Sequence, residues 1–148
     1  SSDDVTLVGV GAIMPEVLDA RERLADLGVQ AGVVCLTSPD LVFRAFQARS
    51  GQRPSWTSPG RSTPAPGDAL VDVWLLDQLF PASHRTPLVT VLDGHPHTLS
   101  FLAGVRGDAI RCLGVTDFGQ ASDLADAYAL HGVDAEAVAE AALDLLHL

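Results

Sequence analysis

The chain of 148 residues contains no lysine, and its nine cationic side chains are all arginines. Without lysine the sequence holds no Gly-Lys-Ser/Thr motif, which excludes a P-loop for nucleoside triphosphates. Nineteen acidic residues give a formal net charge of −10, and an acidic surface repels the phosphates of nucleic acids. We therefore expect no nucleic acid among the partners of this protein.

Cysteines and long apolar runs are also scarce. The two cysteines, Cys35 and Cys112, fall in segments expected to form strands. They are typical of buried, reduced thiols in a cytoplasmic protein and not of a disulfide framework. No apolar run approaches the roughly 20 residues of a transmembrane helix, so we expect no membrane partner. The polar first residues, Ser-Ser-Asp-Asp, show no signal peptide.

Short apolar runs alternate with amphipathic segments along the chain. The apolar runs predict strands, covered on both faces, at residues 5–11, 33–36, 87–92 and 109–115. The amphipathic segments predict helices at residues 15–27, 41–49, 68–80, 97–103, 122–130 and 134–146, the last capped by Asp134. This alternation predicts an α/β fold, a three-layer α/β/α sandwich around a mostly parallel sheet. The length suits a single domain over residues 1–148.

Residues 50–67 interrupt this alternation with a stretch rich in Pro, Ser and Gly. A long segment without periodicity predicts a loop, and such loops are often functional. Trp56 is its expected anchor. The sequence leaves open whether Trp56 packs on its own domain or on another domain or subunit.

A Gly9-Val10-Gly11 turn joins the first strand to the first helix, as in dinucleotide-binding folds. That fingerprint also needs a third glycine and an acidic residue at the end of the second strand. Met14 stands at the third position, and the second strand ends in Cys35-Leu36-Thr37. The pattern therefore favours a structural tight turn over a nucleotide site.

Asp93, His95 and His97 follow the third strand in the sequence Asp-Gly-His-Pro-His. Ligands of parallel sheets bind at the carboxyl ends of the strands, where this segment is expected. Hydrogen bonds within the loop, a metal site and a functional contact are three interpretations of it. Two histidines on a turn diverge unless a further ligand closes a metal site, so the first interpretation is favoured.

Asp117-Phe118-Gly119 follows the fourth strand at the same expected edge. Gly119 permits a positive φ, Phe118 can pin the loop, and Asp117 can accept backbone hydrogen bonds. The next helix start could hold an anion, although a structural role is the default. The sequence contains no Gly-x-Ser-x-Gly motif and no paired cysteine motif, so it predicts no catalytic or metal residues of its own.

Two stretches resemble the C-terminal domain of the transketolase superfamily. Residues 5–43 resemble its opening strand, Gly-x-Gly turn, long helix and second strand, and residues 113–146 are similar to its final strand, loop and helices. Residues 90–102 fall where the family has its third strand. Ser122-Asp123 departs from the Ser-Gly often found there. The resemblance is closest to the thiamine-diphosphate-dependent decarboxylating component of homodimeric pyruvate dehydrogenase, with transketolase second.

The resemblance implies a mixed sheet of about five strands with one antiparallel edge strand. It implies that the chain is a fragment of a longer enzyme that decarboxylates a 2-oxoacid, with pyruvate expected, and acylates a lipoyl carrier. Thiamine diphosphate and magnesium would be held by preceding domains, so no cofactor is expected in this fragment. Those domains, a second copy in a homodimer and a lipoyl acyltransferase core are the implied partners.

The fragment itself is expected to be inactive and to support the dimer. Gly94, His95, Asp117, Phe118 and Gly119 are the candidate residues at the interface or active-site rim, followed by Asp93 and His97. Two other functions stay open: ketol transfer, as in transketolase, and a free-standing module that binds a small anion.

Overall fold

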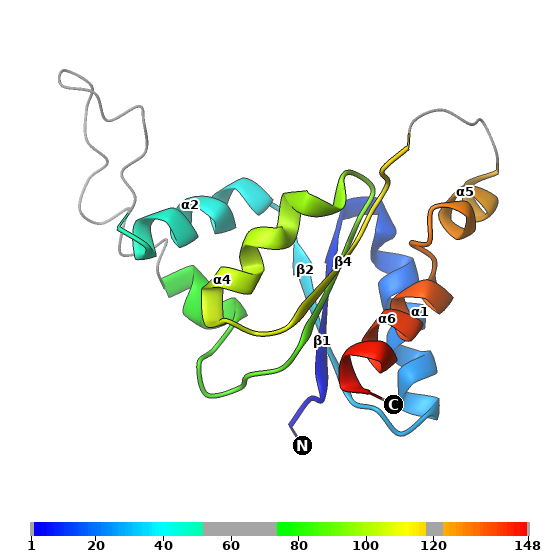
Figure 1. Ribbon diagram of the computed structural model, residues 1–148, viewed down its shortest axis with the longest axis horizontal. Coiled ribbons are helices and arrows are strands. Elements are labelled where there is room, and N and C mark those ends of the chain that lie inside the picture. Colours follow the sequence, from blue (N-terminus) through cyan, green and yellow to red (C-terminus); the bar gives the residue numbers. More distant parts are fainter. Residues whose placement is uncertain (1, 52–73, 118–122, 148) are drawn as a thin grey trace.

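Parallel strands form the centre of the protein in a computed structural model that describes residues 2–51, 74–117 and 123–147 (Figure 1). Within those residues the sheet has four strands in the order β2-β1-β3-β4. They are β1 (Val5–Val10), β2 (Ala31–Leu36), β3 (Leu88–Leu92) and β4 (Ile110–Leu113). β1 and β3 therefore lie in the middle, and β2 and β4 form the edges.

Register aligns the strands so that their carboxyl ends share one edge. Val8 of β1 lies opposite Val34 of β2 and Thr90 of β3, and Thr90 lies opposite Cys112 of β4. All three pairings are parallel. The loops that follow β3 and β4 are consequently neighbours, although residues 93–109 separate these strands in the chain.

Helices cover both faces of the sheet (Figure 1). One face carries α1 (Met14–Asp26), α5 (Leu124–Leu130) and α6 (Ala135–Leu146). The other carries α2 (Pro39–Arg49), the 3₁₀ helix η2 (Pro96–Leu102), α4 (Ala103–Arg106) and a helical segment at 74–79. A 3₁₀ turn, η1 (Gly11–Ile13), joins β1 to α1. This confirms the three-layer α/β/α sandwich.

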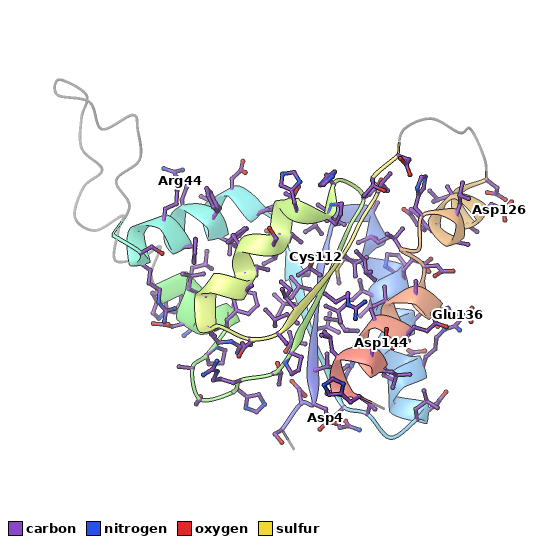
Figure 2. The ribbon with its side chains drawn as sticks, in the orientation of Figure 1. Asp4, Arg44, Cys112, Asp126, Glu136 and Asp144 are labelled. Atoms are coloured by element: carbon purple, nitrogen blue, oxygen red, sulfur yellow. The ribbon has the colours of Figure 1, made fainter. Side chains whose placement is uncertain are left out.

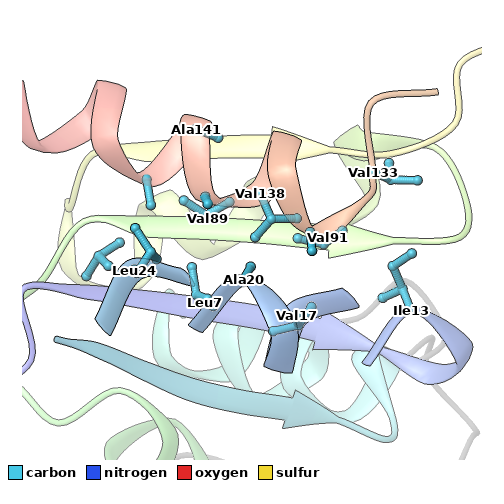
Figure 3. Close-up of a cluster of buried hydrophobic side chains, with 14 of the residues drawn as sticks. Leu7, Ile13, Val17, Ala20, Leu24, Val89, Val91, Val133, Val138 and Ala141 are labelled. Atoms are coloured by element: carbon cyan, nitrogen blue, oxygen red, sulfur yellow. The ribbon is translucent and has the colours of Figure 1, made fainter. Parts of the chain in front are cut away.

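Two apolar cores hold the layers together. Between the sheet and the α1–α6 pair, Leu7, Val89 and Val91 meet Val17 and Val138, all of them fully buried (Figure 3). On the other face, β1 and β3 residues pack against Val42, Leu76, Leu99 and Leu102. Full burial of an aliphatic side chain contributes about 1.5 to 3 kcal/mol, so these layers supply most of the driving force for folding.

The edges of the sheet differ from the expectation. The described residues contain four strands and not five, all parallel, with no antiparallel edge strand among them. The thiol of Cys35 is free but exposed, and Cys112 is free and half-buried in β4 (Figure 2), so the prediction of buried thiols was wrong. Edge strands have one neighbour, which leaves their side chains less covered than those of β1 and β3.

Several apolar helix residues are also more exposed than their periodicity indicated. Leu18 and Leu27 in and after α1 are 47% and 64% exposed, and Trp74 is 61% exposed. The loop at 50–67 and its proposed anchor Trp56 lie largely outside the described residues. In the parts of the chain that the structure describes, no helix combines the length and apolar character required to cross a bilayer.

Candidate functional site

The loops after β3 and β4 meet at the carboxyl edge of the sheet. The backbone N–H of Val115 donates a hydrogen bond to the carbonyl of Gly94 at 2.8 Å. A Cβ atom on Gly114 would lie 2.4 Å from the same carbonyl and 2.8 Å from the nitrogen of Pro96. Gly114 is therefore needed for a close backbone approach that brings the two loops together.

This approach unites part of the site that the sequence predicted. Gly94 and Pro96 lie against Gly114, His95 stands between them in the chain, and Asp117 is exposed three residues beyond Gly114. Phe118 and Gly119 lie outside the described residues. The exposed carboxylates of Asp93 and Asp117 make this edge acidic, which disfavours binding of a small anion.

His95 and His97 contact each other at the start of η2. The backbone N–H of His97 donates to Nδ1 of His95 at 3.3 Å, and the Nδ1 atoms of the two rings are also in hydrogen-bond contact. The ring centroids are 4.3 Å apart. Because Nδ1 of His95 accepts the backbone N–H of His97, the side chain of His95 caps the start of η2.

The histidine pair therefore acts first as a cap for η2, the loop-stabilising role favoured from the sequence. Within the described ranges, no three His, Cys, Asp or Glu side chains are arranged to hold a metal ion.

A buried phenol lies behind this edge. Tyr128 of α5 is 7% exposed, and burial raises its pKa above the ordinary value. The negative charges of Asp93 and Glu16 raise the pKa further, because they oppose formation of a phenolate. Tyr128 thus stays neutral at physiological pH. Its place at this edge could not be predicted from the sequence, because only its position on the amphipathic helix signalled burial.

The glycine turn after β1 is explained by packing. A Cβ on Gly9 would lie 2.5 Å from the sulfur of Met14 and 3.0 Å from a methyl group of Val17. Gly11 has a φ of +67°, a conformation that favours glycine. Gly9 therefore serves the close approach of α1 to β1, and Gly11 serves the backbone turn between them, which agrees with the structural interpretation of this segment.

An aromatic groove lies between α2 and η2, and the sequence analysis did not identify it. Its volume is about 390 Å³, and its lining includes Pro39, Asp40, Phe43, His97, Ser100 and Phe101. The rings of Phe43 and Phe101 meet edge to face with centroids 5.0 Å apart. No spacing signal in the sequence joins residues from two helices so far apart in the chain.

Comparison with known proteins places this arrangement in context. The family described as "Transketolase-like TK C-terminal domain" matches residues 1–134. No curated protein matches the chain. A solved split-gene transketolase, described as an inactive beta4 tetramer, is 21% identical with a TM-score of 0.65, and the match covers 100% of this chain and 40% of that one.

Two structures of transketolase from Pichia stipitis are also similar. A mutant in complex with xylulose-5-phosphate is 19% identical with a TM-score of 0.64, and a complex with sedoheptulose-7-phosphate is 18% identical with a TM-score of 0.61. Each match covers 99% of this chain but 17% of the other. At these identities the likeness shows the fold, and this chain spans less than half the length of each of these three proteins.

Proposed function

We propose that this chain, which belongs to the transketolase-like C-terminal domain family, is the structural and dimerisation domain of a thiamine-diphosphate-dependent enzyme. The family match over residues 1–134 carries the proposal. In this role the chain packs against preceding domains and against a second copy. Gly94, His95, Asp117, Phe118 and Gly119 lie at the interface or the rim of the active site.

The residues of this chain do not fit the cofactor itself. The sequence has no Gly-Asp-Gly motif for diphosphate and magnesium, and it has no lysine. The described part of the chain offers no group of three potential metal ligands. Thiamine diphosphate and magnesium are therefore assigned to the preceding domains, and no catalytic step is assigned to a residue of this chain.

The parent reaction has two candidates. Residues 5–43 and 113–146 favour decarboxylation of a 2-oxoacid, with pyruvate first, followed by acyl transfer to a lipoyl acyltransferase core. The solved structures favour ketol transfer, because their names are those of transketolases with bound sugar phosphates. Both reactions leave the same supporting role to this domain. Two free thiols are compatible with a reducing cytoplasm, where we place the enzyme.

An assay of the full-length enzyme tests the proposal. With thiamine diphosphate and magnesium, acyl-lipoyl formation from pyruvate is compared with ketol transfer between sugar phosphates. Acyl-lipoyl formation is expected. Ketol transfer would reject the oxoacid reaction and keep the role of the domain. Retention of full activity and dimerisation after deletion of residues 1–148 would overturn that role.

A further inference from the structure

The aromatic groove between α2 and η2 has a wall of three phenylalanines. Phe46 lies 5.7 Å from Phe101 and 6.4 Å from Phe43, measured between ring centroids. Phe46 packs so closely on α4 that a Cβ on Gly104 would come within 2.9 Å of its ring. Phe43 is 40% exposed at the surface. The wall is thus fixed from behind and open to a ligand in front.

The groove carries one carboxylate and two hydroxyl groups, which belong to Asp40, Thr98 and Ser100. Asp40 contributes a carboxylate, and none of the ion pairs formed among the described residues includes it. The hydroxyl of Ser100 donates to the carbonyl of His97 at 2.7 Å, so only its lone pairs remain for a ligand. The ring of His97 also lines the groove, beside the ring of His95.

Acceptors beside exposed aromatic rings are complementary to a cation that carries several donors. Guanidinium has five N–H donors, stacks on aromatic rings and stays charged at all physiological pH values. An ammonium group offers a single point charge and stacks less well. The net charge of −10 also attracts cationic partners over a longer range.

We propose that this groove is a docking site for an arginine side chain on a partner protein. The guanidinium pairs with Asp40 and lies against the rings of Phe43 and Phe101. A protein partner is favoured over a free metabolite because exposed aromatic residues and arginine are both enriched at the centres of protein interfaces. The groove binds guanidinium whichever reaction the parent enzyme catalyses.

Amide chemical shifts of the ¹⁵N-labelled chain test the docking site. The probes are the blocked peptides Gly-Arg-Gly, Gly-Lys-Gly and Gly-citrulline-Gly; citrulline has the shape of arginine without its charge. We expect the arginine peptide to shift residues 39–43 and 97–101. Asp40→Asn should weaken binding of the arginine peptide about fivefold, the size expected for a partly exposed ion pair. The citrulline peptide should bind the unmodified chain no more tightly than the arginine peptide binds the Asp40→Asn variant.

Asp26→Asn is the matched control, because Asp26 is an exposed carboxylate at the end of α1, on the opposite face of the sheet. Its affinity for the arginine peptide should equal that of the unmodified chain. Three results would overturn the proposal. They are an equal loss of affinity in Asp40→Asn and Asp26→Asn, chemical-shift changes spread over the whole acidic surface, and binding of the lysine peptide as tight as that of the arginine peptide. Concentration-dependent self-association that Asp40→Asn abolishes would also overturn it, since the occupant would then be a second copy.

Discussion

Glu16, near the start of α1, accepts a hydrogen bond from the backbone N–H of Ala135, the first residue of α6, at 2.9 Å. The two residues are 119 positions apart in the sequence. Asp134 accepts a second bond from the N–H of Ala137 at 3.0 Å. Two side chains thus cap backbone N–H groups in the first turn of α6: that of Asp134, just before the helix, and that of Glu16 on α1. This joins the two ends of the chain on one face of the sheet.

Glu16→Ala should lower the free energy of unfolding by about 1 kcal/mol, because a helix N–H loses its acceptor and a negative charge leaves the helix start. Urea denaturation followed by circular dichroism measures the change. Glu22→Ala is the control, since Glu22 is an exposed acid on the same helix and should change stability by less than about 0.5 kcal/mol. Equal effects of the two substitutions would show that the contact contributes nothing.

Gly114→Ala should destabilise the protein by about 3 kcal/mol, because the added methyl group would collide with the backbone at Gly94 and Pro96. Gly94→Ala is its matched control: the new methyl group would meet only the side chain of Leu92, at 3.5 Å. This variant should change stability by about 0.5 kcal/mol or less. Thermal unfolding of both variants separates a tight approach of the two loops from a general intolerance of substitution at this edge.

Arg106 has a side chain that is 6% exposed, and it holds the connection before β3. Its guanidinium donates to the carbonyl of His84 at 2.6 Å and to that of Thr86 at 3.3 Å, and it pairs with Asp108. Arg106→Met should cost about 3 kcal/mol, since it leaves buried acceptors without donors. Arg85 pairs with the same Asp108 from an exposed position. Arg85→Met should therefore cost about 1 kcal/mol or less in the same denaturation experiment.

The raised pKa of Tyr128 determines how the stability of the protein changes at alkaline pH. Because burial, Asp93 and Glu16 raise its pKa in the folded state above the unfolded value of about 10, the folded chain binds the phenol proton more tightly. The resulting stabilisation is complete below about pH 10 and is lost as the pH rises through the folded-state pKa. Tyr128→Phe removes this titration, so the free energy of unfolding of the variant should fall less steeply above about pH 10. Parallel curves for the two proteins would contradict the assignment.

The central part of the fold follows directly from the sequence. The runs at residues 5–11 and 87–92 are apolar apart from Thr6 and Thr90, and they form the two inner strands of the sheet. Asp134 was predicted as a helix cap and caps α6. At these positions the local sequence pattern and the tertiary environment favour the same residue type, so the local pattern alone predicts the structure.

Features that depend on neighbours in space could not be predicted in this way. Cys35 has the apolar flanks of a buried strand residue, but β2 is an edge strand, and strand order is set by contacts among distant segments. The His95–His97 contact depends on side-chain directions at the start of η2, and the aromatic groove depends on side-chain directions from two elements. The residues at the carboxyl edge of the sheet could be predicted because parallel strands bring their carboxyl ends together. The functional roles of these residues stay proposals.

Calorimetric titration of this chain with thiamine diphosphate and magnesium tests most directly whether it supports chemistry located in other domains. We expect no saturable heat at cofactor concentrations that saturate the full-length enzyme. Saturable binding of the cofactor to residues 1–148 alone, with comparable affinity, would contradict it.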